Sequence, residues 1–92
     1  MYVGQAVIIN KTGLHARPAY DFVNLAKEYN SEIKVRNLNG DDSQAVNAKS
    51  IVFLLSLGIC EGDKIEIMAK GNDEEEAVTA LINLVVSGFN EV

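Results

Sequence analysis

Residues 18–37, PAYDFVNLAKEYNSEIKVRN, pass directly from one hydrophobic period to another. In the first half, apolar side chains recur every three or four residues, at Ala19, Phe22, Val23, Ala26 and Tyr29. In the second half, Ile33 and Val35 alternate with charged residues. The first spacing predicts a helix and the second a strand with one buried face. A helix that leads straight into such a strand indicates a mixed α+β fold.

The segment before this stretch predicts a strand and a turn. Residues 2–9 are rich in apolar and β-branched side chains, which favour a strand. Residues 10–13 have turn composition. Pro18 is expected to set the start of the helix, because proline suits the first helical turn. Asn30 and Ser31 are expected to end the helix.

The segment after this stretch predicts two more strands and two helices. Asn39-Gly40 is a strong hairpin signal, with a short return strand within residues 42–46. Asn47 is expected to cap a short apolar helix that ends at Gly58. Residues 64–70 alternate again and predict a strand, and Gly71-Asn72 opens the last predicted helix.

The predicted order is therefore βαββαβα in one domain, residues 1–92. With 48% hydrophobic residues, the chain has the composition of a folded globular domain. Helices and strands in this order favour an α+β fold, a four-stranded antiparallel sheet with three helices on one face. The other face of such an open-faced sandwich would meet solvent.

The charge and cysteine content exclude several classes of protein. The chain has 13 acidic and 8 basic side chains, a net charge of −5, which argues against nucleic-acid binding. A small RNA-binding βαββαβ module, with exposed aromatics on a basic sheet, is the lower-ranked alternative. One cysteine and one histidine cannot build a structural zinc site, and we expect no metal and no cofactor. One cysteine cannot form an internal disulfide, and no apolar run is long enough to span a bilayer, so we expect a cytoplasmic protein without membrane insertion.

Residues 13–18, GLHARP, place the single histidine at a predicted helix start. A helix N-terminus has unpaired N–H groups and the positive end of the helix dipole. A phosphoryl group on the His15 ring would gain these donors, and the planar guanidinium of Arg17 suits phosphate oxygens. Two plainer interpretations stay open: His15 as an ordinary capping residue and Arg17 as a solvated surface residue.

The second predicted helix start contains Ser50. With Asn47 as N-cap, Ser50 falls three residues into the helix, where a phosphate would meet the favourable dipole end. The alternative is a polar residue that supports the cap. The side chains behind it are more apolar than one buried face needs, so they form either a partner-docking patch or core: Ile51, Val52, Leu54, Leu55 and Leu57.

Two further features have plain structural interpretations. Cys60 is expected to be a small buried hydrophobe rather than a reactive thiol. The acidic run 73–76 is expected to complement the dipole of the last helix rather than to bind a metal.

Two motifs together resemble one known family. Gly13-Leu14-His15-Ala16-Arg17-Pro18-Ala19 resembles the active-site motif of the histidine-containing phosphocarrier (HPr) family of the bacterial sugar phosphotransferase system. Residues 46–51, followed by residues 55–58, resemble the regulatory-serine region of the same family. The match extends over essentially the whole chain, and the family fold is an open-faced β-sandwich.

The resemblance implies a stoichiometric phosphocarrier rather than an enzyme. Enzyme I, charged by phosphoenolpyruvate, would phosphorylate His15 at Nδ1, Arg17 would help to hold the group, and an enzyme IIA would receive it. Ser50 matches the serine that an HPr kinase/phosphorylase modifies, and the modified form binds a catabolite-control transcription factor. The resemblance places the docking surface at Tyr20, Ile51, Val52 and Leu55, and we expect a monomer.

The chain departs from the family pattern in two places, and two alternatives remain. Residues 39–46 form a longer segment with the extra acids Asp41 and Asp42, and Ala48 replaces the commoner leucine. These changes lie just before Ser50, so they bear on recognition by the kinase. The runner-up function is a mainly regulatory protein that acts through Ser50. A related alternative is a carrier in a nitrogen-linked branch of the relay.

Overall fold

A computed structural model describes residues 1–40 and 44–90. Within these residues, four strands form one sheet in the order β1-β4-β2-β3, and every neighbouring pair is antiparallel. The strands are β1 (Tyr2–Val7), β2 (Glu32–Asn37), β3 (Val46–Asn47) and β4 (Lys64–Lys70). The predicted four-stranded antiparallel sheet is confirmed.

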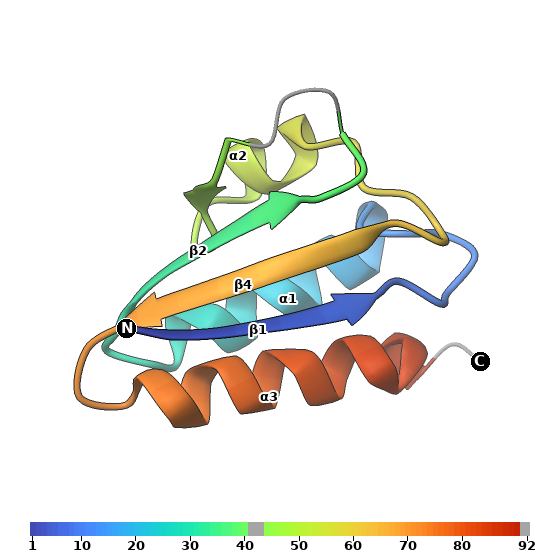
Figure 1. Cartoon of the computed structure of the whole chain (residues 1–92). Helices are drawn as coiled ribbons and strands as arrows, with labels where there is room; N and C mark the ends of the chain where they lie inside the picture. The colour runs from blue at the N-terminus through green and yellow to red at the C-terminus, as the bar shows by residue number, and fades with distance from the viewer. Residues whose placement is uncertain (41–43, 91–92) are drawn as a thin grey trace.

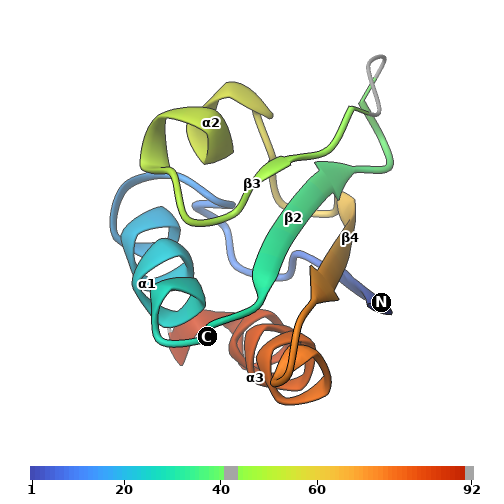
Figure 2. The ribbon, with the colours of Figure 1, turned by 90° about the vertical axis from the view of Figure 1, so that its left-hand side faces the viewer.

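Three helices cover one face of this sheet, as Figures 1 and 2 show. They are α1 (Ala16–Lys27), α2 (Ile51–Ser56) and α3 (Glu74–Val86), and a 3-10 turn, η1 (Gly88–Asn90), follows α3. The opposite face of the sheet has no helix over it (Figure 2), which confirms the predicted open-faced sandwich. Among the described residues, no helix combines the length and apolar character needed to cross a bilayer.

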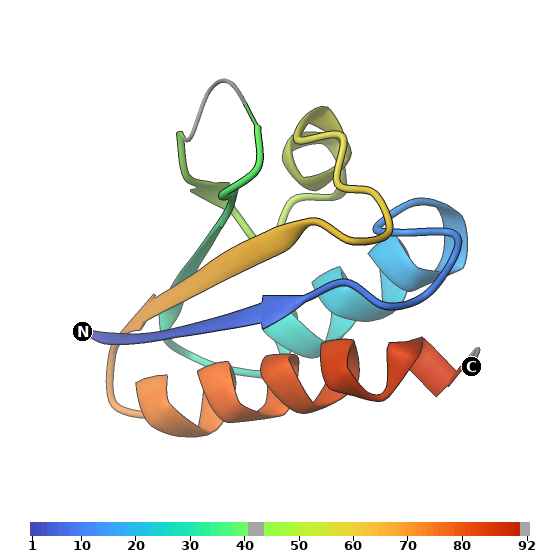
Figure 3. The same cartoon turned by 45° about the vertical axis from the view of Figure 1, so that its right-hand side comes forward.

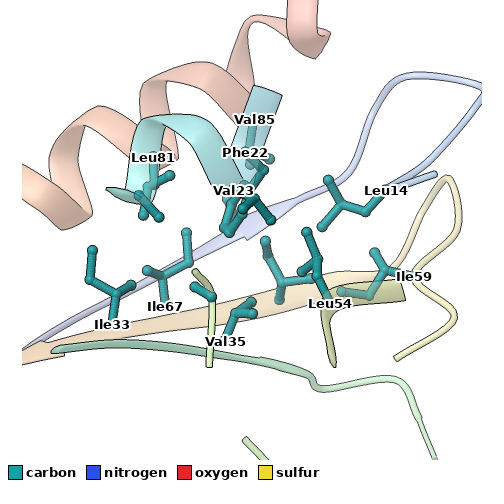
Figure 4. Packing of buried hydrophobic residues seen from close by; sticks show 14 of the residues in the cluster. Leu14, Phe22, Val23, Ile33, Val35, Leu54, Ile59, Ile67, Leu81 and Val85 are labelled. Atoms are coloured by element: carbon teal, nitrogen blue, oxygen red, sulfur yellow. The ribbon is translucent and has the colours of Figure 1, made fainter. Parts of the chain in front are cut away.

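The core lies between the sheet and the helices. Ile33 and Val35 of β2 are fully buried, and so are Ile65 and Ile67 of β4, as the alternation in both strands predicts. Phe22 of α1 completes the same cluster from the helical layer (Figure 4). The helical stripe and the two alternating strands therefore converge on a single hydrophobic core.

Gly4 lets α3 approach β1 closely. A β-carbon at Gly4 would lie 2.3 Å from Cδ1 of Ile82 and 2.9 Å from Cγ1 of Val78. Both distances are below van der Waals contact, so any larger residue would displace the side chains of Ile82 and Val78. The glycine within β1 is thus explained by packing, as is common for glycine inside a strand.

Several predicted boundaries are wrong by a few residues. The first strand ends at Val7 rather than Ile9. Helix α1 begins at Ala16, so Pro18 lies in its first turn, as predicted. The return strand is Val46–Asn47 rather than within 42–46, although residues 41–43 lie outside the described residues and with them part of the longer 39–46 segment. Helix α2 ends at Ser56 rather than Gly58.

The start of α3 differs from prediction in a more informative way. The helix begins at Glu74, and Asp73 just before it does not cap it. The Asp73 carboxylate instead accepts hydrogen bonds from the backbone N–H groups of Asn30 (2.8 Å) and Ser31 (2.9 Å) and from the Ser31 hydroxyl. These donors, the Ser31 hydroxyl first, hold the pKa of Asp73 below its ordinary value of 3.8. Asp73 therefore joins the end of α1 to the start of α3.

Candidate functional site around His15

His15 lies at the point where the loop after β1 enters α1. Its backbone is extended, with φ −132° and ψ 162°, and it occupies the N-cap position of the helix. The preceding residue, Leu14, is fully buried, and its N–H donates to the Ile59 carbonyl at 3.1 Å. His15 itself is half-buried. The loop is therefore anchored to the core one residue before the histidine.

The His15 side chain does not cap its own helix. No hydrogen bond joins the imidazole to the backbone N–H groups of α1. The plainer interpretation, in which His15 is an ordinary capping residue, fits its N-cap position but not its side chain, which forms no cap hydrogen bond. The ring nitrogens are not used to hold the helix start, which leaves them available for chemistry.

The backbone next to His15 forms a site with free donors. Ala16 has φ +52°, a left-handed conformation that costs a non-glycine residue about 1–2 kcal/mol. A left-handed residue beside right-handed helical residues makes successive N–H groups converge, and such concavities bind anions. Pro18 has no N–H, and no hydrogen bond among the described residues engages the N–H groups of Ala16 and Arg17. This arrangement can receive negatively charged oxygens beside the His15 ring.

Arg17 lies at the edge of a shallow hollow with three other residues. The hollow is lined by Arg17, Asp21, Phe89 and Asn90. The Arg17 side chain is exposed, so its guanidinium is accessible to an incoming anion. The structure thus brings the start of α1 next to the end of the described chain, as Figure 3 shows.

No local sequence pattern predicts that the turn at Gly88–Asn90 lies beside Arg17. Three consecutive residues there have left-handed backbones, with φ of +67° at Gly88, +56° at Phe89 and +61° at Asn90. Phe89 is buried, which holds the turn against the body of the domain. Gly88 just after a helix is a standard helix-end signal and could have predicted the turn, although not its neighbour Arg17.

Ser50 occupies a different position from the predicted one. Ser50, and not Asn47, is the N-cap of α2, and its Oγ accepts from the N–H of Phe53 at 3.4 Å. The Asn47 side chain instead accepts from the N–H of Lys49 at 2.9 Å. Both residue types cap helices well, and the sequence alone could not decide between them. The prediction that Ser50 lies three residues inside the helix is wrong.

Lys49 ties the start of α2 to the end of α1. Its ammonium group donates to the carbonyl oxygen of Tyr29 at 2.7 Å. Tyr29 follows the last turn of α1, whereas His15 stands at the first. The hydrogen bond from Lys49 thus reaches the end of α1 opposite to His15.

The apolar side chains of α2 divide between core and surface. Leu54 is fully buried, and Ile51 and Leu57 are partly buried against the core. Val52 is 71% exposed and Leu55 is 41% exposed, and on α1 Tyr20 is 59% exposed. The alternative in which all these α2 residues are core is therefore wrong.

Phe53 is an exposed apolar residue that the sequence analysis did not single out. It is 54% exposed, between Val52 and the buried Leu54. Two adjacent exposed apolar residues on one short helix are unusual unless a partner covers them. The available signal was the run of apolar residues from 51 to 55, which exceeds what one buried face of a helix requires.

Cys60 is exposed, so the prediction of a small buried hydrophobe is wrong. It lies in the loop before β4, where its N–H donates to the Asp63 carboxylate at 2.9 Å. Among the described residues, no three histidine, cysteine or acidic side chains lie close enough to hold a metal ion.

Comparisons with known proteins agree with this geometry. The family described as "PTS HPr component phosphorylation site" matches residues 3–87. A crystal structure titled HPr-C-His from Thermoanaerobacter tengcongensis has 46% identity and a TM-score of 0.91, covering 100% of this chain and 99% of that chain. A phosphocarrier protein HPr from Bacillus anthracis has 38% identity and a TM-score of 0.84, covering 91% and 95%.

Two kinds of curated relative also match. Phosphocarrier protein NPr of Escherichia coli is 42% identical over 92 residues, covering 99% of each chain. The multiphosphoryl transfer protein of Salmonella typhimurium is 39% identical over 85 residues, covering 92% of this chain. This chain spans only 22% of the length of that longer relative. The match over residues 3–87 and the full-length similarity establish that this chain belongs to the HPr family of the phosphotransferase system.

Proposed function

We propose that the protein carries a phosphoryl group on His15 between a phosphorylated donor protein and an acceptor protein. The donor would be an enzyme I charged by phosphoenolpyruvate, and the acceptor an enzyme IIA of carbohydrate uptake. The observation behind this proposal is the His15 side chain, which stands beside free backbone donors without forming a cap of its own. The protein acts as a stoichiometric carrier and has no substrate reaction of its own.

The transfer step needs only one nucleophilic nitrogen. The lone pair of Nδ1 of His15 forms a bond to phosphorus while the bond from phosphorus to the donor breaks. The donor atom keeps the electron pair of the broken bond, so the step is balanced without a co-reactant. In the second transfer, a nucleophile of the acceptor protein bonds to phosphorus while the bond from phosphorus to Nδ1 breaks. Nδ1 keeps that electron pair, so His15 is again unmodified.

Arg17 and the first-turn amides stabilise the transferred group. The N–H groups of Ala16 and Arg17 are free to donate to phosphoryl oxygens. The guanidinium of Arg17 adds a permanent positive charge with a planar donor fork. Each dipole contact at a helix end contributes about 0.3–1 kcal/mol. Contributions of this size suit a carrier, because it must hold the phosphoryl group without trapping it.

Partner proteins dock on the apolar surface of α1 and α2. Tyr20, Val52 and Leu55 expose large side chains, and Phe53 extends this surface. Ile51, which the resemblance places in the same set, is partly buried and acts mainly by supporting the exposed residues. An apolar patch with Arg17 at its active-site side is the composition typical of a partner-binding surface.

The direct test is phosphorylation by enzyme I. The protein is incubated with phosphoenolpyruvate and enzyme I, and the phosphate is characterised by its stability. Phosphohistidine is labile in acid and stable in base, so that pattern is the expected result. A label that persists in His15→Ala would overturn the assignment.

A second function, regulation through Ser50, has its own structural support. Ser50 Oγ accepts from the N–H of Phe53, so it stands at a helix start beside the exposed side chains of α2. A phosphate on this oxygen would alter both the cap and the neighbouring surface. An HPr kinase/phosphorylase with ATP should give an acid-stable label that Ser50→Ala abolishes. No label with an active kinase would leave His15 transfer as the sole function.

The donor could belong to either of two phosphoryl relays, one linked to sugar uptake and one linked to nitrogen. The chain is similar both to a protein named phosphocarrier protein NPr and to proteins named HPr, and the nitrogen-linked and sugar-linked donors are the two candidates. Single-turnover rates with the two types of enzyme I separate these alternatives. The faster donor identifies the branch.

A further inference from the structure

Asn10 holds the turn that leads to His15. Its backbone carbonyl accepts from the N–H of Gly13 at 3.1 Å, and its side-chain amide donates to the carbonyl of Gly13 at 3.0 Å. Both polar groups of Gly13 are thus bound by one residue. Asn10 is fully buried, so water does not compete for these contacts.

The residues after this turn have little freedom to shift. Gly13 has φ +70°, and a β-carbon there would lie 2.6 Å from the Ile59 carbonyl oxygen and 2.9 Å from Cα of Cys60. The N–H of Leu14 donates to the same Ile59 carbonyl at 3.1 Å. The turn before His15 is therefore pressed against the loop that leads into β4, as Figure 3 shows.

His15 depends on this main chain for its position. Its imidazole has no hydrogen bond to the helix start, so the ring is not held through its own nitrogens by α1. The backbone of His15 is held by α1 after it and by Gly13 and the buried Leu14 before it. The Asn10 amide thus fixes the backbone only two residues before the histidine.

We propose that Asn10 is a positioning residue, whose buried side-chain amide sets the His15 ring relative to the free amides of the first turn of α1. This inference rests on the proposed phosphoryl transfer. Asn10 touches neither the ring nor the phosphoryl group, and it acts through the backbone of Gly13. A displacement of about 1 Å in a reacting group can lower a rate by about a hundredfold. Loss of the amide should therefore lower the transfer rate without changing how partners dock.

The test compares Asn10→Ala with a matched control at Ser31, directly before β2. Ser31→Ala also removes a partly buried side-chain hydrogen bond, to Asp73, but lies away from His15. Phosphoryl transfer from enzyme I is measured for both variants and the wild type. For Asn10→Ala we expect a fall in kcat of about tenfold to a hundredfold with KM unchanged. For Ser31→Ala we expect both constants to equal those of the wild type.

A spectroscopic measurement makes the test independent of the donor enzyme. The proton and carbon resonances of the His15 ring should shift in Asn10→Ala and stay in place in Ser31→Ala. If Asn10→Ala does not fold, Asn10→Ser keeps a small hydroxyl donor and should give a smaller fall in kcat. The inference would be overturned by any of three results. These are a wild-type kcat in a folded Asn10 variant, a change in KM alone, or an equal fall in kcat in the Ser31 control. A wild-type protein that is never phosphorylated would instead overturn the proposed function.

Discussion

The two helix starts that contain His15 and Ser50 use their polar side chains in opposite ways. The hydroxyl oxygen of Ser50 accepts a hydrogen bond from the N–H of Phe53 in α2, whereas the His15 side chain makes no such bond to α1. Both N-cap residues have an extended backbone, but the residue after His15, Ala16, is left-handed, with φ +52°. Altering a side chain that caps its own helix lowers the free energy of unfolding. A side chain that forms no cap can react without this loss of stability. The same kind of position thus supports structure in α2 and, in the proposed mechanism, chemistry in α1.

The contrast between His15 and Ser50 predicts the strongest change in activity for His15→Ala. Because His15 forms no cap, its removal should abolish phosphorylation by enzyme I while the free energy of unfolding changes by less than about 0.5 kcal/mol. Radiolabelling and urea unfolding measure the two quantities. A destabilisation of about 1 kcal/mol or more would show that the ring supports the helix, contrary to the contrast drawn with Ser50.

Arg17→Ala should give the next largest effect. Removing the guanidinium should slow transfer by about tenfold to a hundredfold, equivalent to about 1.4–2.7 kcal/mol in the activation free energy. The exposed side chain contributes little to folding, so the melting temperature should stay close to that of the wild type. Arg17→Lys is the matched control, since it keeps the charge and loses the planar fork. Transfer rates are measured in single-turnover reactions. A wild-type rate in Arg17→Ala would contradict the proposed role of Arg17 in stabilising the phosphoryl group.

Ser50→Ala should show the reverse pattern from His15→Ala. Loss of an N-cap oxygen costs about 1 kcal/mol of stability, and transfer to His15 should be unaffected. Ser50→Asp is the control, because aspartate is an equally good cap and should preserve the free energy of unfolding. Equal stability of the alanine variant and the wild type in urea titrations would mean that the 3.4 Å contact with Phe53 contributes nothing.

The smallest expected effect concerns the backbone of the His15 region. Ala16→Gly should raise the free energy of unfolding by about 0.5 kcal/mol, because glycine adopts a positive φ without steric cost but loses more entropy on folding. Thermal unfolding measures the gain. A glycine variant less stable than the wild type by about 1 kcal/mol would argue that Ala16 is not in a costly conformation.

The elements with a strong period could be predicted from the sequence. The strand over Lys64–Lys70 has the predicted bounds, and the alternation of Ile33 and Val35 places them in the core. These predictions succeeded because the side-chain period alone sets the buried face of a strand. The position of His15 at the start of a helix was also predictable, since Pro18 restricts where that helix can begin.

The features that depend on contacts distant in sequence were not predictable. Asp73 bonds to Asn30 and Ser31, more than 40 residues away, so no local pattern reveals its role. Arg17 meets Phe89 only because α1 and α3 pack side by side. Cys60 is exposed, although its residue type favours burial. In each case tertiary packing, and not local preference, decides the outcome.

The most direct test of the central claim is nuclear magnetic resonance of the phosphorylated protein. The protein is labelled with ¹⁵N, phosphorylated by enzyme I with phosphoenolpyruvate, and examined for coupling between phosphorus and the ring nitrogens of His15. The proposed mechanism predicts one-bond coupling to Nδ1 and none to Nε2. Phosphate on another residue, or no phosphate at all with an active enzyme I, would contradict the account.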